Sequence, residues 1–566
     1  MWSWIFPFWI LGLLLVCTRT FVSVCVASAF RLRRRSHGAF SAFPSSFVSP
    51  SSAFERRQRA WAKLSRQRRV ETDRNESRQR FNFPATESPS SSSSSSFSVS
   101  VSSLSLQQQE EEEPRQKMEV DSNSRGREEA QAVDVIVVGS GFAGLIAAVR
   151  LSDAGKKVAI LEKMPTPGGN SCINGGIISI PQSPEQQAME QQGGPLPGDS
   201  PDRLLKDMLA AGLGENDVQL ATIVAEEGKG VVDWCRKRFG LTFRSNVTEL
   251  GGHSVARSLQ MTKGRGFDLT DRMQNATRDN GVPLLTDCKV QRFLKDSEGL
   301  VSGVVYENQA TGVTHEMRCS DAVLLCTGGF SQDRAFLASA GAQFPADLKS
   351  TNQPGATAEV LQAAVEQLGA ATTGLHRVQL GPWASPDEEG FGVGPGFAMG
   401  CGFPHGILVD PETGLRFVNE LASRKTRADA LLKIGHPSVL VCDSVGVQFA
   451  LYGMRRALEN GVVFKFDSLE ELGAYFRIPI APFLEEVQRY NEAVAAGVTD
   501  RVGKRASPLT KPIEERPFYA MRSWPKVHYC CGGLKIDQHG RVLSASDGLP
   551  IPRLFGAGEV TGGVHG

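Results

Sequence analysis

The feature that most constrains the fold is a glycine-rich turn, GSGFAG, at residues 139–144. It follows the short, β-branched apolar run 133–138, which is typical of a strand buried on both faces of a parallel sheet. It precedes a helix that we expect from Leu145 to Ala154, because a helix-ending glycine follows at position 155. The first glycine permits a tight turn, the second lets the backbone approach a pyrophosphate, and the third lets helix and strand pack closely. The turn therefore predicts a phosphate site at a helix N-terminus.

A second strand completes this unit and places an acid at its end. Residues 157–161 form the strand, and Glu162 follows at the position where a carboxylate can accept hydrogen bonds from ribose hydroxyls. Strand, glycines, helix, strand and acid within one short segment predict a dinucleotide-binding βαβ unit. A glycine-rich turn that binds no ligand is the alternative.

The residues that follow distinguish FAD from NAD. The segments PGGNS at 167–171 and NGG at 174–176 would form a second backbone-rich surface along an extended cofactor. With these motifs the chain resembles the flavoprotein subunit family of fumarate reductase and succinate dehydrogenase. It is most similar to the soluble fumarate reductase and flavocytochrome c branch, which has the same order of strand, GxGxxG, acid and GGNS. In membrane-bound relatives a histidine in this region is attached covalently to the flavin. This stretch contains no histidine, so the resemblance implies non-covalent FAD.

Three later segments extend the resemblance. Residues 322–330, AVLLCTGGF, match the family's ATGGF strand, and residues 350–357, STNQPGAT, resemble its TNQPGA turn. The family then has Gly-Asp-Gly, whereas residues 358–360, AEV, keep the acid and lose both glycines. Residues 556–566 match GAGEVTGGVHG, in which Glu559 is expected to accept hydrogen bonds from the FAD ribityl hydroxyls. The predicted cofactor-binding residues are Gly139, Gly141, Ala143, Gly144, Glu162, Lys163, Gly168, Gly169, Asn170, Ser171, Gly175, Gly176, Thr327, Gly328, Gly329, Glu359 and Glu559.

The motifs predict an α/β fold, in which a Rossmann-like FAD-binding domain holds an inserted α+β capping domain. Apolar residues at helical spacing predict helices within 200–245, the second from Asp217 to Phe239, and a long helix at 270–280. Strands at 288–294, 301–307 and 316–320 are expected to form a β-meander, with 322–330 as a further strand. The expected domains are the first part of the FAD-binding domain at 131–375, the capping and substrate domain at 376–511, and the second part of the FAD-binding domain at 512–566.

Two segments carry the predicted catalytic residues. Residues 416–424, RFVNELASR, match the family's active-site segment, and the resemblance implies that Arg424 donates a proton to one substrate carbon while flavin N5 delivers hydride to its neighbour. Glu420 is a candidate neighbour on the proton path. His528 matches a histidine that binds a substrate carboxylate in relatives. The alternatives are a surface helix arginine for Arg424 and a satisfied core residue for His528.

The chain also departs from the family at its expected active site. Relatives have His-Pro-Thr where this chain has GPW at 381–383, and Thr-Glu-x-x-Arg where it has AMGCG at 398–402. The side chains that hold a second carboxylate and relay the proton in relatives are therefore missing. Loss of polar partners disfavours a charged group, and Trp383 favours an apolar or aromatic substrate end.

We therefore predict an FAD-dependent reductase of an α,β-unsaturated carboxylate, similar to fumarate reductase. The alternatives are an enoate reductase for a monocarboxylate other than fumarate and an inactive FAD-binding homologue. The charge balance of 62 Lys and Arg against 61 Asp and Glu does not suggest nucleic acid as a partner. The 11 cysteines form no CxxC or CxxCH motif, so neither a metal site nor a fused haem is expected. NAD(P)H, a flavin or a separate redox protein remain as electron donors.

Two further features of the sequence each allow two interpretations. His253, in a GGHSVAR segment that relatives share, is either a flavin-side contact or a turn residue. The neighbouring Cys530 and Cys531 are expected to be buried thiols rather than a redox disulfide. Relatives continue beyond the counterpart of Gly566 with Ala-Asn-Arg-Leu-Gly-Gly and a helix whose arginine clamps the substrate carboxylate, so we expect an incomplete gene model.

The N-terminal region has the composition of targeting segments. Residues 1–29 are apolar and end in a small-x-small pattern, which predicts a signal peptide rather than a membrane anchor. Residues 30–87 are rich in Arg and Ser and poor in acids, as in a transit peptide, and residues 88–130 form a polar, low-complexity linker. This order resembles the two-part presequence of algae with secondary plastids. We therefore expect a plastid protein, with the secretory pathway or another organelle as the alternative.

Overall fold

The computed structural model describes residues 133–191, 198–248, 250, 253–262, 266–506 and 510–565. The chain divides into two compact units, and all described residues belong to the one that includes Glu129–Gly566. The predicted signal peptide, transit-like presequence and linker lie outside the described residues. Within the described part, no helix is both long and apolar enough to cross a membrane.

An eight-stranded sheet forms the centre of the predicted FAD-binding domain. Its main path is, in spatial order, β18 (Arg541–Leu543), β19 (Pro550–Gly556), β9 (Val313–Leu325), β1 (Val133–Val138), β2 (Val158–Leu161) and β6 (Leu284–Leu285). From β19 to β6 all neighbours are parallel, and β18 pairs antiparallel with β19. This parallel core confirms the predicted α/β class.

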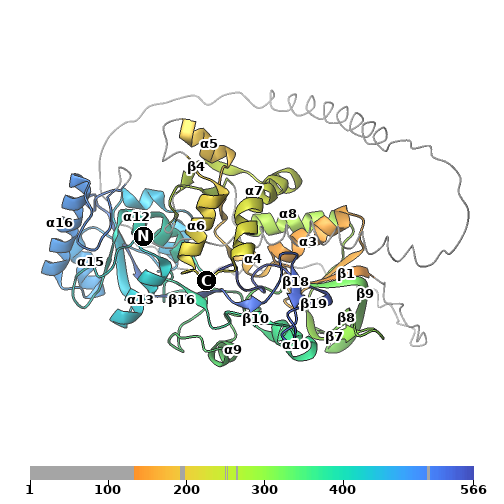
Figure 1. The fold of residues 1–566 in the computed structure, drawn as a ribbon. Coiled ribbons are helices and arrows are strands. Elements are labelled where there is room, and N and C mark those ends of the chain that lie inside the picture. Colours follow the sequence, from red (N-terminus) through yellow and green to blue (C-terminus); the bar gives the residue numbers. More distant parts are fainter. Residues whose placement is uncertain are drawn as a thin grey trace, which may run out of the picture. The chain divides into compact units, whose positions relative to one another are not determined.

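The sheet is buried on both faces, as the apolar sequence of β1 predicts. Val135 and Val137 belong to a core that includes residues of α3 and α8, whereas Ile136 and Val138 belong to a second core that includes residues of β7 and β8. Figure 1 shows α3 and α8 on one side of β1, and β7 and β8 on the other. The helices of this part of the chain are α3 (Phe142–Asp153), α4 (Gly169–Ile173), α5 (Pro184–Gln191), α6 (Pro201–Ala211), α7 (Val218–Phe239), α8 (Gly266–Asp279), α9 (Arg334–Ser339) and α10 (Glu359–Leu368).

The predicted β-meander is present, but its last strand and the strand predicted after it are one. β7 (Cys288–Lys295) and β8 (Val301–Asn308) pair antiparallel, and β8 pairs with the first part of β9. We predicted separate strands at 316–320 and 322–330, whereas β9 runs without a break from Val313 to Leu325. Its first half is mostly exposed and its second half is buried beside β1, so one strand joins the meander to the parallel sheet.

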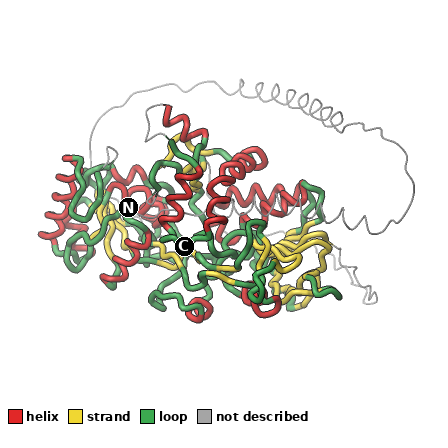
Figure 2. Tube along the Cα trace, viewed as in Figure 1, coloured by secondary structure: helices red, strands yellow, loops and turns green. Residues whose placement is uncertain are grey.

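The capping domain is built on an antiparallel sheet of four strands. In spatial order these are β12 (Ile407–Val409), β13 (Ser438–Cys442), β15 (Phe518–Ser523) and β14 (Phe464–Phe466). Because β15 belongs to this sheet, the cap includes residues beyond 511, where the sequence suggested its end. Figure 2 shows the strands gathered mainly in two groups, which correspond to this sheet and the eight-stranded one. The cap helices are α11 (Gly394–Phe397), the π-helix η1 (Ala398–Gly402), α12 (Phe403–His405), α13 (Arg424–Ile434), the 3₁₀ helix η2 (Gly446–Phe449), α14 (Met454–Glu459), α15 (Leu469–Phe476) and α16 (Ile480–Ala496).

Three small sheets lie beside the segments that contain the predicted site residues. One is formed by β3 (Ile177–Ser179), β5 (Ser258–Met261) and β4 (Phe243–Thr248), a second by β10 (Thr372–Thr373) with β17 (Gly533–Leu534), and a third by β11 (Val378–Gly381) with β16 (Lys526–Cys530). The β11–β16 pair is antiparallel and brings the start of the GPW segment at 381–383 beside the strand that contains His528.

Candidate active site

The glycine turn after β1 has the geometry that its sequence predicts. Gly139 has φ +102°, and a Cβ there would lie 2.4 Å from the carbonyl oxygen of Cys326, the residue after β9. A Cβ at Gly144 would lie 1.9 Å from the Gly139 carbonyl oxygen, so helix and turn are in close contact. Gly141 is the N-cap of α3 and has no side chain to fill the space before the helix. The first turn of α3 therefore presents its backbone to a cavity.

That cavity, which we call the cofactor cavity, is lined by the glycine turn, the acid after β2, the segment after β9 and the C-terminal motif. The predicted residues that line it are Gly139, Gly141, Ala143, Glu162, Lys163, Gly169, Asn170, Ser171, Thr327, Gly328, Gly329, Glu359 and Glu559. Gly175 lines an adjoining cavity, whereas Gly144, Gly168 and Gly176 are not among the described lining residues of either. Gly144 packs helix against turn, and Gly168 and Gly176 have φ values of +113° and +71° that place them in tight loops.

Two acids mark the first part of the cofactor cavity. Glu162 is buried and accepts hydrogen bonds from the backbone N–H groups of Ser140 at 3.0 Å and Met164 at 2.9 Å. Glu359 pairs with Lys163 at 3.1 Å, and although burial opposes ionisation, the Thr357 hydroxyl, its own N–H and Lys163 lower the pKa of Glu359 to about 2. Glu359 is therefore a carboxylate at neutral pH. A carboxylate beside a glycine turn and a helix N-terminus suits the ribose and pyrophosphate of a dinucleotide.

Glu559 lies where the cofactor cavity meets the second one. It lines both, and its carboxylate accepts the backbone N–H of Cys530 at 3.0 Å. A Cβ at Gly329 would lie 2.4 Å from Glu559 Oε1, so this glycine makes room for the acid. Burial raises the pKa of Glu559 to about 7, against the opposing N–H groups of Cys530 and Gly329. The two cavities also share Phe142, Asn170 and Ser171, so they form one continuous site for an extended cofactor.

The second cavity, which we call the apolar cavity, is lined mainly by apolar side chains. These include Ile173, Ile177, Leu250, Trp383, Phe391, Met399 and Leu451. Among its described lining residues, Arg424 is the cation and Glu559 the carboxylate. Met399 comes from the π-helix η1, a local distortion that is often found at functional sites. The segments 381–383 and 398–402, in which the family's polar residues are missing, therefore both contribute apolar side chains to this cavity.

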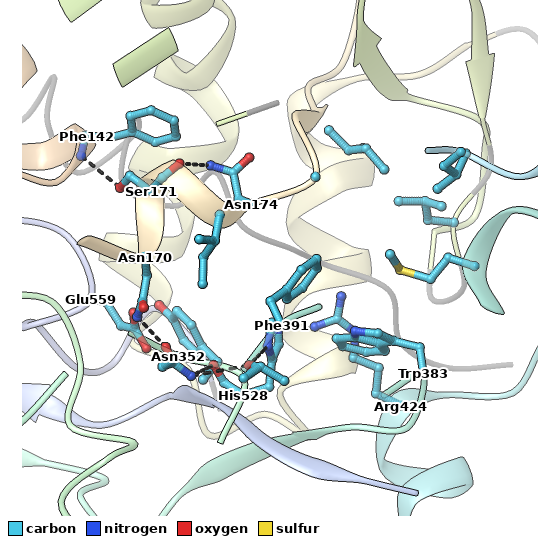
Figure 3. Close-up of a pocket in the computed structure, with 18 residues that line it drawn as sticks. Phe142, Asn170, Ser171, Asn174, Asn352, Trp383, Phe391, Arg424, His528 and Glu559 are labelled. Carbon is cyan, nitrogen blue, oxygen red and sulfur yellow. Dashed lines mark hydrogen bonds between the residues drawn. The ribbon is translucent and has the colours of Figure 1, made fainter. Parts of the chain in front are cut away.

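Arg424 begins α13 and enters the apolar cavity from the cap. Its guanidinium lies 4.2 Å from the ring centroid of Trp383 and donates a hydrogen bond to Gln379 of β11. Arg424 is only 3% exposed, so it is not the surface arginine of the alternative interpretation. Burial, followed by the neighbouring Arg427, holds the pKa of Arg424 well below its usual range. Figure 3 shows the Arg424 and Trp383 side chains lying against each other.

His528 of β16 faces the same cavity. Its Nδ1 lies 2.5 Å from the Thr351 hydroxyl, and its ring meets Trp383 edge to face at 4.8 Å and Phe391 at 5.9 Å. Burial, with a smaller effect of Arg424, lowers the pKa of His528 well below its usual value. The imidazole is therefore neutral at neutral pH, and it is held beside the arginine rather than in a distant core.

A hydrogen-bond chain ties the two predicted motifs together. Asn170 of α4 donates to the side-chain oxygen of Asn352, and Asn352 donates to the carbonyl oxygen of His528 at 2.8 Å. Gln353 donates its N–H to Asn170 at 2.8 Å. The TNQPGA turn thus positions both the GGNS segment and the β16 histidine (Figure 3).

Two predicted residues lie elsewhere. Glu420 is fully buried and binds Arg416 through two hydrogen bonds of 2.9 and 2.7 Å, and it is not among the described residues that line the apolar cavity. His253 is buried with its Nδ1 3.0 Å from Arg257, whose guanidinium binds Asp199. His253 is not among the described residues that line either cavity. Cys530 and Cys531 are free thiols, and Cys530 is buried, as expected, whereas Cys531 is half-buried.

Sequence reasoning missed several residues of the site. Thr351 and Asn352 lay inside a recognised turn but were not assigned a role, although their polar side chains beside a glycine turn were a usable signal. Gln379, Phe391 and Leu451 carry no motif, and only the β11–β16 pairing and the folded cap bring them to the cavity.

Comparisons with known proteins agree with this geometry. A family model described as an FAD binding domain matches residues 134–566. The acrylate reductase flavoprotein subunit of Shewanella woodyi is 37% identical over 446 residues, which is 77% of this chain and 86% of the relative. A fumarate reductase (cytochrome) of Shewanella frigidimarina is 34% identical over 439 residues, with coverages of 77% and 73%. The open conformation of a flavocytochrome c3 fumarate reductase matches with a TM-score of 0.61 and 28% identity, over 77% of this chain and 74% of that one.

Proposed function

Because the chain belongs to the FAD-binding flavoprotein family that includes fumarate and acrylate reductases, we propose that it is an FAD-dependent reductase of an α,β-unsaturated monocarboxylate. The observation that carries the proposal is the composition of the apolar cavity. One end holds Arg424 and a neutral His528, which suit a single carboxylate, and the remainder is lined by aliphatic and aromatic side chains.

The residues have separate roles in the reaction. When bound, FAD supplies a hydride to one carbon of the activated double bond. Arg424 donates a proton to the neighbouring carbon, because its buried guanidinium is more acidic than in water. His528 hydrogen-bonds the substrate carboxylate, with its ring fixed by the Thr351 hydroxyl and Trp383. Trp383 holds the Arg424 guanidinium in place and excludes water from the reacting carbons.

The same cavity disfavours a dicarboxylate. A second carboxylate would leave water for a surface of Leu250, Met399 and Leu451, where the described residues offer it no cation. A buried charge without a partner costs several kcal/mol. We therefore expect acrylate, crotonate or cinnamate to be reduced about 10²-fold more efficiently than fumarate.

The test is anaerobic reoxidation of the chemically reduced FAD protein by these acids, followed by flavin absorbance. Arg424→Gln is the catalytic control, and its rate should fall at least about 10²-fold. If fumarate reoxidised the flavin faster than every monocarboxylate, the substrate assignment would be wrong. If no acid reoxidised it, the reductase proposal would be wrong.

For localisation we propose the plastid, on the composition and order of the segments 1–29 and 30–87. A fluorescent protein fused after residue 130 should accumulate in plastids of an alga with secondary plastids. Fusion from residue 30 should not enter the secretory pathway, because the signal segment is then missing. Retention of the full fusion in the endoplasmic reticulum would reject the plastid assignment.

A further inference from the structure

A second buried arginine lies one helical turn after the proton donor. Arg427 has no exposed surface, and it is not among the described residues that line the apolar cavity. Residues three apart share a helix face, so Arg424 and Arg427 lie on the same side of α13. Both are in the N-terminal turn, where the helix dipole disfavours positive charge. Two buried cations at this place are costly for the fold.

Contacts on the cap side hold Arg427 in place. Its guanidinium lies 4.3 Å from the ring centroid of Phe403 in α12, which follows the π-helix of the apolar cavity. Burial lowers the pKa of Arg427 to about 9, and Glu420, which is itself fixed by Arg416, opposes this effect, so Arg427 is charged at neutral pH. An apolar side chain of similar volume would fill the same space beside Phe403 without burying a charge. Packing alone therefore does not require a charge at this position.

The charge states of the groups around Arg424 indicate that the charge of Arg427 affects this arginine. His528 of β16 and His565 of the C-terminal segment both have pKa values lowered by burial and then by Arg424, so they are neutral at neutral pH. Cys531, which follows β16, favours the charged form of Arg424, and its thiol has a pKa raised to about 12 by burial and then by Glu559. Among the described titratable groups that affect the pKa of Arg424, Arg427 is therefore the one that is charged at neutral pH.

We infer that Arg427 is a positioning residue for the proton donor, and that its buried charge, one helical turn away on the same face of α13, turns the Arg424 guanidinium toward the apolar cavity and favours release of its proton. The inference rests on the proposed function. In the proton step an N–H bond of Arg424 breaks as a C–H bond forms with the electron pair of the former double bond. The product state holds a neutral guanidine beside Arg427, which removes a repulsion between like charges. The guanidine regains its proton from solvent before the next turnover.

Replacing Arg427 by Met keeps the volume and removes the charge, so Arg424 should become a weaker acid. We expect kcat to fall on the order of tenfold with KM little changed. The alkaline limb of kcat should move to higher pH by about one unit or more, or beyond the measured range, because the Arg424 pKa rises. If Arg427 had only a structural role, its replacement would lower the stability of the protein but would not move the alkaline limb of the kcat profile to higher pH.

A binding measurement tests the same shift without turnover. Propionate should bind the oxidised FAD protein while Arg424 is protonated, and calorimetry from pH 6 to about 10.5 should show affinity falling on the alkaline side. In Arg427→Met this fall should occur at higher pH. Arg427→Lys should restore the wild-type limb and most of kcat. Lys425→Met is the matched control, because it removes a cation from the same helix turn at a side chain that is 71% exposed.

The outcomes separate the two proposals. If wild type reduces no enoate, the proposed function fails, whereas the propionate profiles still test Arg427. If wild type is active and the limbs of wild type and Arg427→Met coincide, or Lys425→Met shifts the limb equally, the inference is wrong. A flat propionate profile in both proteins also overturns it. Thermal unfolding verifies folding, and Arg427→Gln replaces the Met variant if that protein does not fold.

Discussion

At the scale of single residues, Gly381 and Trp383 act as a pair. A Cβ at Gly381 would lie 3.0 Å from Cζ2 of Trp383, so the indole ring occupies the space that a side chain at 381 would need. The ring in turn is 1% exposed and supports both Arg424 and His528. The departure from His-Pro-Thr is therefore one coupled change, in which a large apolar ring replaces a polar ligand.

This coupling predicts the effect of reversing it. Gly381→His alone should lower the unfolding free energy by about 1–3 kcal/mol, because the new side chain overlaps the Trp383 ring. The double variant Gly381→His, Trp383→Thr should relieve the overlap and supply a carboxylate ligand. We expect the ratio of kcat/KM for fumarate to that for crotonate to rise about tenfold or more in the double variant. Equal ratios in wild type and double variant would show that these positions do not set the specificity.

Glu559 gives a second prediction at this scale, on stability against pH. Burial raises its folded-state pKa to about 7, above the unfolded value of 4.5. A raised pKa means that the protonated acid favours folding, so this contribution is present below about pH 4.5 and is lost as pH rises through 7. We expect it to amount to about 3 kcal/mol between pH 4 and pH 8.

Glu559→Gln removes this titration. In denaturant unfolding, the difference in unfolding free energy between wild type and Glu559→Gln should change by that amount across the range, with wild type losing relative stability at high pH. Glu298, in the exposed β7–β8 turn, supplies the control as Glu298→Gln. A parallel pH dependence of wild type and Glu559→Gln would place the Glu559 pKa near its ordinary value.

At the scale of elements, the β1–turn–α3 unit allows a test of cofactor binding that spares the fold. A Cβ at Gly141 would lie 3.2 Å from Ser171 Oγ and would otherwise project into the space before α3. Gly141→Ala should therefore fold but bind FAD at least about tenfold more weakly, because the methyl keeps the pyrophosphate from the helix N-terminus.

The matched control lies at the other end of the same helix. Gly155 has φ +83°, a Cβ at this position would meet no heavy atom within 4 Å, and Asn tolerates this backbone region. Gly155→Asn should leave FAD affinity unchanged in fluorescence titration. Equal affinities for wild type and Gly141→Ala would remove this turn from the phosphate site.

The same elements show which parts of the fold can be predicted from the sequence. Local rules were enough for the glycine turn, for α7 between Asp217 and Gly240, and for the meander, because each depends on residues close in the chain. They failed at β9, where a turn-like SD pair lies inside one strand that two different sheets hold in place. They also could not place Gln379 or Arg427, whose roles depend on contacts between segments far apart in sequence.

At the scale of the whole molecule, two ligand sites share one set of walls. The cofactor and apolar cavities both use Phe142, Asn170, Ser171 and Glu559, and the Asn170–Asn352–His528 chain joins the first motif to the carboxylate end. FAD and a carboxylate should therefore stabilise the same arrangement of these residues. Free FAD at about 100 times its Kd should add about 2.7 kcal/mol to the unfolding free energy.

This arrangement predicts reciprocal coupling between the two ligands. Removing FAD should weaken propionate binding by about 5-fold or more, and propionate should strengthen FAD binding by the same factor, because linkage is symmetric. Calorimetry of each ligand with and without the other measures both factors. Asn352→Ala breaks the chain at its centre while leaving the glycine turn intact, so it should bring both factors toward one and change FAD affinity alone much less. Unequal factors would point to an additional ligand-linked process. If the coupling were undiminished in Asn352→Ala, the residues that line both cavities would transmit it, rather than the Asn170–Asn352–His528 hydrogen-bond chain.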